Sequence, residues 1–582
     1  MNRNTELHFS ETPQIDIKRS KFEMSHSHKT TFNVGDIIPI EVSEILPGDT
    51  VQLDMASLVR MATPIYPIMD NLYMDTYFFF VPNRLLWDHW AEFWGQNDDP
   101  WTQQIEYQIP QITAPTGGWS EGTIADYMGI PTKVANLSVS ALFFRSYAKC
   151  VNDWFRDENL KRNCHIYKDE TTRTGSNGNN YVTDVELGGK PAKAAKMHDF
   201  FTSALPAPQR GPSVTIPLGS VAPLTGTATG NVNVTIPGST DHTLLEITNG
   251  NPYTRFGKYD HTTVATTQGA STSFKLQYVN QTGDFSIVDN TTNFGVIPNN
   301  LGIKEKARTG TGTATINLNN GYADLSQATA STINQLRTAF AIQKYYENAG
   351  LHGTRYIEYL RSVFGVTSSD ARLQRAEYLG GERIPLNIDQ IIQTSSTDST
   401  SPQGNTSGFS CTYNSADMFT KSFEEHGILL GLAVVRTEHT YQQGLHRMFS
   451  RKKWLDYYNP FFANLGEAGI ENRQIYAQGT NKDSEIFGYQ EAWAEYRYAE
   501  NRVSGYMRSN ATGSLDVWHF ADKYNALPIL GETWIDEPYE NVDRTIAVTS
   551  QLTHQFIADF YFKTYYTRPM PVYSIPGLID HV

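Results

Sequence analysis

Apolar and polar positions along the chain show two different periods. Residues 51–55 alternate between apolar and polar side chains, which predicts a strand with one buried face. The segment 427–436, GILLGLAVVR, is a continuous apolar run and predicts a strand buried on both faces. Residues 73–82 predict a strand that ends at a proline before a short helix, and residues 545–566 are extended and aromatic.

A spacing of three to four residues between apolar positions predicts amphipathic helices elsewhere. It is clearest at 139–155, where one helix face must be buried. Similar spacing predicts helices at 333–340 and 356–364, and more loosely at 489–503. Strands near both ends of the chain, with helices and loops between them, predict a mainly β protein: one β-sandwich whose connections have been enlarged.

Residues 211–322 differ from the rest of the chain in composition. Thr, Gly, Asn and Ser dominate, only twelve of these 112 residues are charged, and residues 211–240 carry no charge. Segments 231–236 and 313–318 alternate polar with apolar residues, which favours an inserted, exposed β-rich subdomain over the alternative, a disordered linker. Residues 394–409 are typical of a flexible loop.

Length and charge narrow the class of protein. A chain of 582 residues needs several cores or one core with large insertions. Its 19% charged residues and its 32 Tyr, 29 Phe and 10 Trp suit extensive subunit interfaces, although a large β-rich monomer could share this excess. The net charge of −14 argues against a chain that coats nucleic acid as a whole. Residues 1–30 hold five Lys or Arg against four acids and form no polybasic arm.

The three cysteines, Cys150, Cys164 and Cys411, give neither a disulfide framework nor the spacing of a zinc site. Reduced thiols from a cytosolic assembly fit best. The N-terminus lacks the pattern of a signal peptide, and no apolar stretch is long enough to span a bilayer. We therefore expect a soluble protein without membrane insertion.

Five long blocks, in the same order along the chain, resemble the major capsid proteins of the Microviridae, and of the gokushovirus branch in particular. The blocks are residues 32–90 (FNVGDIIPIEV…LLWDHW), 141–160 (ALFFRSYAKCVNDWFRDENL), 341–366 (AIQKYYENAGLHGTRYIEYLRSVFGV), 424–451 (EEHGILLGLAVVRTEHTYQQGLHRMFSR) and 488–508 (GYQEAWAEYRYAENRVSGYMR). Colinear matches of this length are far more specific than a short motif.

The resemblance implies an eight-stranded viral jelly roll with large loop insertions that contain helices and a small β-rich protruding subdomain. Sixty copies, assembled through pentamers, would form a T=1 icosahedral virion shell around a circular single-stranded DNA genome in the host bacterial cytoplasm. Further implied partners are a small basic DNA-binding virion protein, a scaffolding protein, a minor pilot protein and a host cell-surface receptor. The resemblance implies no enzyme activity and no cofactor.

The same resemblance suggests a division of the chain into four parts. They are an N-terminal arm at 1–31, a first part of the jelly-roll core at 32–210 with a helical insertion near 137–160, a host-attachment protrusion at 211–322, and a second part at 323–582 with helical insertions and an extended C-terminal tail.

Short motifs that could indicate catalysis or metal binding are not supported by the residues around them. Residues 118–122 match GxSxG, the turn that presents a catalytic serine, but they follow a Pro-Thr-Gly turn instead of a buried strand, so a glycine-rich turn is the better interpretation. His26 and His28, and the pair Cys164 and His165, lack a third ligand nearby in the sequence, so exposed or singly hydrogen-bonded side chains are favoured over a metal site.

The best local candidate for DNA contact is a basic segment with an indole, formed by Arg447, Arg451, Lys452, Lys453 and Trp454. Cations neutralise phosphate while the indole can stack on an unpaired base. A solvated basic face or an intersubunit salt bridge is the alternative. Because the chain is acidic, we expect a separate basic protein to supply most of the packaging charge.

The aromatic cluster at 73–101 could form a platform for sugars, but core and interface packing is favoured, with Trp90 and Trp94 buried. The alternative function for the whole chain is accordingly a carbohydrate-binding or depolymerising β-sandwich protein.

Overall fold

The computed structural model describes residues 18–96, 106–215, 333–353, 355–398, 402–550 and 552–574, and the backbone of short strands between residues 224 and 323. The chain divides into two compact units. The larger unit comprises residues 1–212 and 344–582, and the smaller unit comprises residues 213–343. The smaller unit therefore ends later than residue 322, where the Thr- and Gly-rich composition ends.

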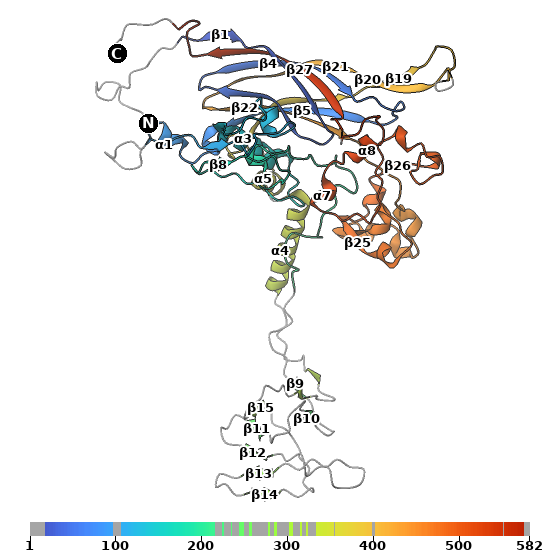
Figure 1. Cartoon of the computed structure of the whole chain (residues 1–582). Helices are drawn as coiled ribbons and strands as arrows, with labels where there is room; N and C mark the ends of the chain where they lie inside the picture. The colour runs from blue at the N-terminus through green and yellow to red at the C-terminus, as the bar shows by residue number, and fades with distance from the viewer. Residues whose placement is uncertain are drawn as a thin grey trace, which may run out of the picture. The chain divides into compact units, whose positions relative to one another are not determined.

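Two antiparallel sheets form the centre of the larger unit (Figure 1). The first sheet contains, in spatial order, β1 (Ser20–Glu23) and β2 (His26–Phe32), which both pair with β27 (Phe556–Arg568), then β4 (Thr50–Met61) and β21 (Thr412–Ser422). The second sheet contains β18 (Glu377–Pro385), β5 (Leu72–Pro82), β22 (Gly427–Thr437) and β3 (Ile38–Ile45).

The main core lies between these sheets. Phe78 and Leu429 of the second sheet and Leu53, Phe560 and Phe562 of the first sheet belong to one fully buried cluster. Along β4 and β27 buried and accessible residues alternate, so the predicted one-sided strand at 51–55 is confirmed. Ten of the eleven residues of β22 are buried, which confirms the strand predicted to be buried on both faces.

Long insertions cover the outer face of the second sheet. Helix α3 (Ala141–Cys150) continues as a π-helical turn to Phe155, which confirms the helix predicted at 139–155. Its Phe144 and Tyr147 belong to a second cluster with Phe79 and Leu430 of the sheet. Figure 1 shows α3 and α5 (Tyr356–Phe364) on this side of the sandwich, away from the first sheet.

Small elements surround α3 within the same insertions. After β5 come η2 (Asn83–Leu85) and α1 (Trp90–Phe93), as predicted for the region after Pro82. The other elements are β6 (Gln111–Thr113), α2 (Ile124–Tyr127), β7 (Ser138–Ser140), β8 (Arg173–Thr174) and η4 (Val185–Leu187).

Residues 438–535 form a lobe beyond the end of β22, here called the C-terminal lobe. It packs around a third buried cluster that includes Tyr441, Ile475, Phe487 and Trp534. Its elements are β23 (Thr440–Tyr441), η6 (Arg447–Ser450), η7 (Trp454–Asp456), η8 (Pro460–Phe462), β24 (Glu467–Glu471), α6 (Asn472–Ile475), η9 (Asn481–Ser484), β25 (Ile486–Glu491), η10 (Ala494–Tyr496), β26 (Asn501–Arg502), η11 (Gly505–Met507), η12 (Asp516–Trp518) and α7 (Glu532–Ile535).

The helix predicted at 489–503 is wrong. Its first residues belong to strand β25, which pairs with β24. Trp493 then takes a left-handed backbone conformation with φ of 69°, which a regular helix cannot continue through. The apolar spacing there reflects side chains that meet different neighbours, not one helix face.

Helices α4 (Ile333–His352) and α5 confirm two predicted helices. Their apolar stripes are nevertheless exposed, with 69% of Ile333, 63% of Phe340 and 65% of Tyr356 accessible.

The short strands of the smaller unit are β9 (Leu224–Thr225), β10 (Val234–Thr235), β11 (Leu244–Thr248), β12 (Arg255–Lys258), β13 (Gln277–Val279), β14 (Phe285–Ile287), β15 (Gly302–Lys306), β16 (Thr315–Ile316) and β17 (Tyr322–Ala323).

β1 and most of β2 lie in the proposed N-terminal arm 1–31. Both strands pair with β27, and Phe32 at the end of β2 is buried in the core.

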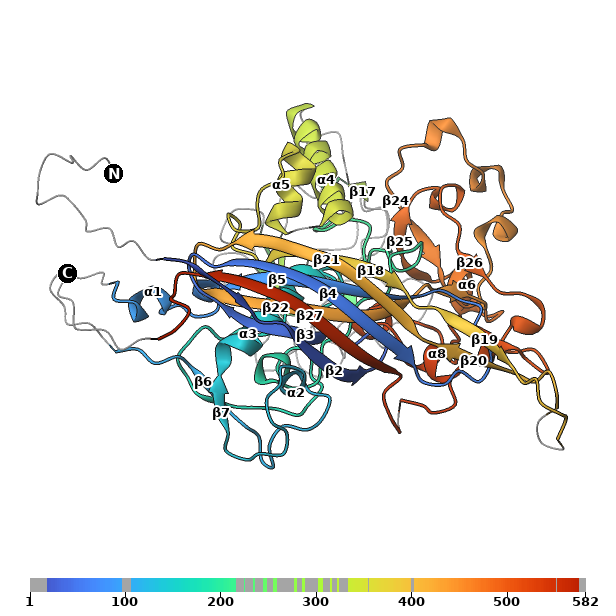
Figure 2. The same ribbon diagram turned by 90° about the horizontal axis from the view of Figure 1, so that it is seen from above.

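Two predicted boundaries need correction. Of the extended region 545–566, only the part from Phe556 is strand, and α8 (Glu540–Asp543) precedes it. The loop predicted at 394–409 ends early, because β20 (Thr406–Ser410) pairs with β19 (Ile388–Ile392); Figure 2 shows this hairpin.

Candidate functional site

The predicted basic segment lies in the C-terminal lobe, where its two arginines are already paired. The Arg451 guanidinium lies 3.1 Å from the Glu495 carboxylate, and only 9% of the Arg451 side chain is exposed. Arg447 lies 3.8 Å from the same carboxylate. Arg451 also stacks on two rings, 4.4 Å from the Tyr496 centroid and 5.3 Å from the Tyr457 centroid. The Arg451 guanidinium therefore stabilises the packing of the lobe.

Lys452, Lys453 and Trp454 of the same segment are exposed. Their backbone is held in a tight turn, because the Asp456 carboxylate accepts the N–H groups of Lys452 and Lys453, each at 2.7 Å. These two bonds lower the pKa of Asp456, so the turn carries a fixed negative charge beside the lysines. The structure thus places the five predicted residues in one segment, in which Glu495 neutralises Arg451 and lies 3.8 Å from Arg447.

A second accessible surface is the outer face of the first sheet. Tyr413, Tyr561 and Ile557 project from it with exposed fractions of 70%, 47% and 56%. At its β2 edge a hollow of about 620 Å³ is lined by side chains that include Arg60 and His554. Basic and acidic groups both occur there, so this face carries no concentrated positive charge.

A buried ionic cluster fixes the start of the C-terminal lobe. His439 is fully buried, and its two ring nitrogens lie 3.2 Å from the Asp522 carboxylate and 3.0 Å from the Glu537 carboxylate. Lys196 lies 3.2 Å from Asp522, and the backbone N–H of Thr437 donates to Glu537 at 3.1 Å. The charges of two cations and two carboxylates therefore balance inside the protein.

The electrostatics of this cluster keep His439 protonated. Burial by itself would lower the pKa of His439, but the Glu537 and Asp522 carboxylates outweigh it and raise that pKa to about 10. Although burial opposes it, the attraction of Lys196 and His439 lowers the pKa of Asp522. Every group of the cluster is engaged by another, so it acts as a clamp between distant segments. Sequence reasoning missed this cluster because no local pattern links residues 196, 439, 522 and 537.

The GxSxG match at 118–122 is a glycine-rich turn, as predicted. Gly118 has φ of 86° and closes the turn with a bond from its N–H to the carbonyl of Pro115 at 2.8 Å. Trp119 is fully buried, and the carbonyl of Ser120 accepts the hydroxyl of Thr123 at 2.7 Å. The motif thus lies directly before α2, whose N-cap residue is Thr123.

The predicted histidine and cysteine pairs are engaged by separate partners. His26 lies 2.8 Å from the Glu41 carboxylate, and this hydrogen bond raises the pKa of His26 to about 9. His28 contacts the carbonyl of Ile40 at 2.8 Å. Burial raises the pKa of Cys164 to about 11, while the ring of His165 contacts Tyr167. Across the described ranges, no group of three or more His, Cys, Asp or Glu side chains could hold a metal ion.

The tryptophans of the 73–101 cluster do not share one environment. Trp87 is fully buried, Trp90 is half-buried, and Trp101 lies outside the described residues. Trp94 does not lie in the core of the single chain: 60% of it is exposed, and its ring stacks on His426 at 4.7 Å. Burial of Trp94 in a subunit interface stays a prediction. None of the residues of α1 is fully buried: Trp90 and Phe93 are partly buried against the second cluster, and Trp94 follows the helix.

The two-sheet sandwich with enlarged connections defines a β-rich protein. Residues 10–578 match the family model described as capsid protein (F protein). The chain is 42% identical to the capsid protein VP1 of Spiroplasma virus 4, covering 99% of this chain and 98% of that protein. It is 41% identical to the capsid proteins VP1 of Bdellovibrio phage phiMH2K and of Chlamydia phage 1, each over at least 97% of both chains.

The chain therefore belongs to the capsid protein (F protein) family. The resemblance to gokushovirus-type capsid proteins is confirmed, and the protein is a structural component of a phage virion. In the part of the chain that the structure describes, no helix combines the length and apolar character needed to cross a bilayer.

Proposed function

We propose that this chain is the major capsid protein of a small single-stranded DNA phage and that sixty copies, assembled through pentamers, form its T=1 icosahedral shell. One observation carries the proposal: the match to phage capsid proteins extends over nearly the whole chain, including the insertions. No chemical step is needed, because closed symmetry makes individually weak contacts add up to a stable particle.

We further propose that the sandwich is the eight-stranded viral jelly roll. If the strands β2, β3, β4, β5, β18, β21, β22 and β27 are numbered one to eight along the chain, the first sheet reads 1-8-3-6 and the second 5-4-7-2. Strands that follow one another in the sequence thus alternate between the two sheets along most of the chain, as in two interleaved Greek keys. This order supports the jelly-roll assignment.

The proposed partners follow from charge. A chain with a net charge of −14 is a poor match for a polyanion, so a separate small basic virion protein supplies most of the neutralising charge. Scaffolding and minor pilot proteins act in assembly, which takes place in the host cytoplasm. Direct DNA contact by Arg447, Arg451, Lys452, Lys453 and Trp454 stays a prediction; Lys452 and Lys453 are its most accessible cations.

Residues 211–322 are proposed to face outward and to bind a host cell-surface receptor. Their low charge and their Thr-, Asn- and Gly-rich sequence suit an exposed segment that tolerates change on a rigid scaffold. Particles in which these residues are replaced by a short Gly-Ser linker should still assemble but should lose adsorption to host cells. Unchanged adsorption would contradict the receptor role alone.

The shell proposal is tested by expressing the chain with its virion partners and analysing the product by light scattering and electron microscopy. We expect uniform spherical particles of megadalton mass that protect single-stranded DNA from nuclease. A persistent monomer or small oligomer would contradict the proposal. Omitting the basic protein should abolish tight DNA packaging at physiological salt, and efficient packaging without it would refute the assignment of the packaging charge.

A further inference from the structure

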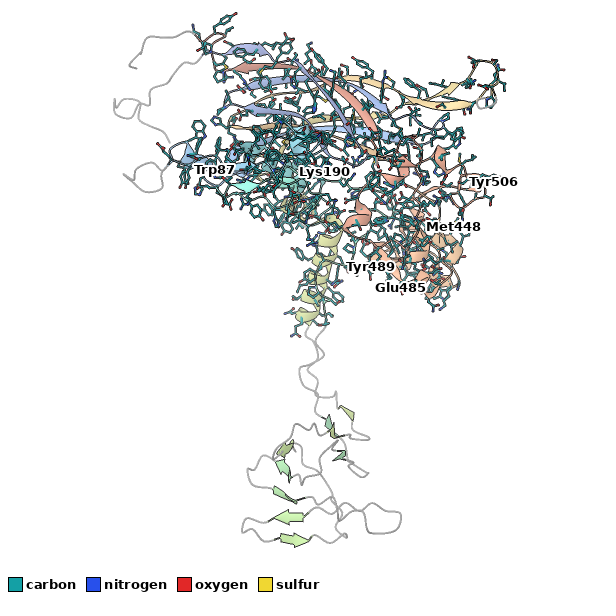
Figure 3. The ribbon with its side chains drawn as sticks, viewed as in Figure 1. Trp87, Lys190, Met448, Glu485, Tyr489 and Tyr506 are labelled. Carbon is teal, nitrogen blue, oxygen red and sulfur yellow. The ribbon has the colours of Figure 1, made fainter. Side chains whose placement is uncertain are left out.

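An exposed cluster of large side chains, here called the aromatic patch, lies in the C-terminal lobe. Figure 3 shows the side chains of the lobe, with Met448, Tyr489 and Tyr506 labelled. The members of the patch and their exposed fractions are Trp454 (70%), Leu455 (49%), Tyr457 (55%), Tyr458 (47%), Phe461 (93%) and Tyr496 (51%). Side chains of this kind normally lie inside a protein or an interface.

Ring contacts link three members of the patch, Tyr457, Tyr458 and Tyr496, and the ring of Trp454 lies 6.3 Å from that of Phe462. Tyr458 lies 6.2 Å from Tyr496 and 5.8 Å from Trp493, measured between ring centroids. The Arg451 guanidinium lies over the rings of both Tyr457 and Tyr496, and the indole N–H of Trp493 donates to the carbonyl of Phe462 at 2.8 Å. Residues from the two segments 454–462 and 493–496 are therefore fixed in one surface before any partner arrives.

The segment of chain that carries the patch has balanced charge. Between Arg447 and Tyr498 the chain has seven Lys or Arg and seven Asp or Glu residues. Glu495 neutralises Arg451, which is nearly buried. A polyanion gains affinity from unpaired cations that displace its counterions, and the patch offers few of them. Neutral surfaces rich in Tyr, Trp and Arg are instead typical of protein–protein contacts.

We propose that the aromatic patch is a contact surface for a second copy of this chain in the assembled shell. The inference rests on the proposed shell-forming function and names the surface through which it acts. The six side chains leave on the order of 700 Å² open, more than the largest apolar patch of a typical monomer and close to the roughly 800 Å² that one partner contributes to a stable interface. A copy of the same chain is the partner present in every particle.

The direct test places a photo-crosslinking amino acid at position 461 in the full-length chain, expressed with its virion partners. After irradiation of assembled particles we expect a covalent adduct of two chains on a denaturing gel, and no such adduct in dilute, unassembled chain. The matched position is Tyr506, in the same lobe and as exposed as Trp454. We expect position 506 to give at least tenfold less adduct. An adduct of position 461 with DNA would overturn the proposal.

A substitution test gives an independent measurement. The double variant Trp454→Ser/Phe461→Ser should lower particle yield at least tenfold, while Trp454→Phe and Tyr506→Ser stay within twofold of the parent chain. The thermal unfolding temperature of unassembled chain separates assembly from folding, because the replaced side chains are exposed and should leave it unchanged. Normal particle yield from the folded double variant would overturn the inference. If the parent chain itself formed no particles, the shell function would fail instead.

Discussion

The two sheets of the sandwich contain similar strands but have different surroundings. In the second sheet, β5 and β22 are covered on both faces, by the first sheet on one side and by the α3 insertions on the other, while the edge strand β18 is largely accessible. The first sheet has one buried face and one accessible face, from which Tyr413 and Tyr561 project. Figure 2 views the first sheet from its accessible side, with its strands lying next to one another.

This difference distinguishes the side chains that stabilise the folded subunit from those that are available for association with partners. Large side chains on the doubly covered sheet are held in place by the chain itself, so they contribute to the stability of the single subunit. Equivalent side chains on the accessible face contribute little to that stability and remain available to partners. The same distinction applies to the C-terminal lobe, which contains buried members of the ionic cluster, His439 and Asp522, and the exposed aromatic patch.

The largest effect is expected from Phe79→Ala in the middle of β5. Phe79 is 1% exposed in the second core cluster, so its truncation should lower the free energy of unfolding by about 3–5 kcal/mol. The matched control is Tyr561→Ala on β27, which should cost under about 1 kcal/mol because 47% of Tyr561 is exposed. Denaturant unfolding of the full chain, followed by tryptophan fluorescence, measures both. Equal losses would break the distinction between the sheets.

A comparable loss is expected from His439→Ala just after β22. Removing the imidazole leaves the Glu537 carboxylate buried without its cation, and breaking a buried pair in this way costs about 3–5 kcal/mol. His165→Ala is the control, since His165 is exposed and its ring contacts the hydroxyl of Tyr167, so its loss should cost under about 1 kcal/mol. The same unfolding experiment measures both variants. A His439 variant as stable as the His165 variant would show that the cluster does not clamp the lobe.

The smallest effect is a dependence of stability on alkaline pH. His26 and His439 have folded pKa values of about 9 and about 10, above the ordinary value of 6.5. Their stabilisation is therefore complete below pH 6.5 and is lost as the pH rises toward 9 and 10. The melting temperature should fall between pH 7 and pH 9.5, by about 1 °C for each kcal/mol lost in a chain of 582 residues. His439→Gln should flatten this slope, and an unchanged slope would contradict the protonated state of His439.

Much of the sandwich could be predicted from sequence, because the spacing of apolar residues within each strand shows which of its faces are buried. The alternation at 51–55 and the continuous run at 427–436 each identified a strand and the number of its buried faces. The helix at 139–155 was equally plain, since its apolar residues meet a single surface. Where residues meet several different neighbours, as at 489–503, the same spacing gave a helix that does not exist.

Only part of the candidate site could be predicted from the sequence. The basic residues around Arg451 were identified, but their pairing with Glu495 joins positions 44 residues apart and no local pattern predicts it. The dense aromatic run 454–462 was visible in the sequence and would have pointed to the patch. Exposure decides whether such a run is core or contact surface, and exposure depends on the neighbours that the fold supplies.

The sequence by itself determined the protein family, the β-rich class, the main strands and the acidic charge, because these are properties of residues and of short segments. Only the tertiary structure decided which aromatic rings are buried, which cations are already neutralised and which carboxylates surround His439. These properties depend on distances between residues far apart in the chain, and those distances exist only after the sheets and the lobe have folded.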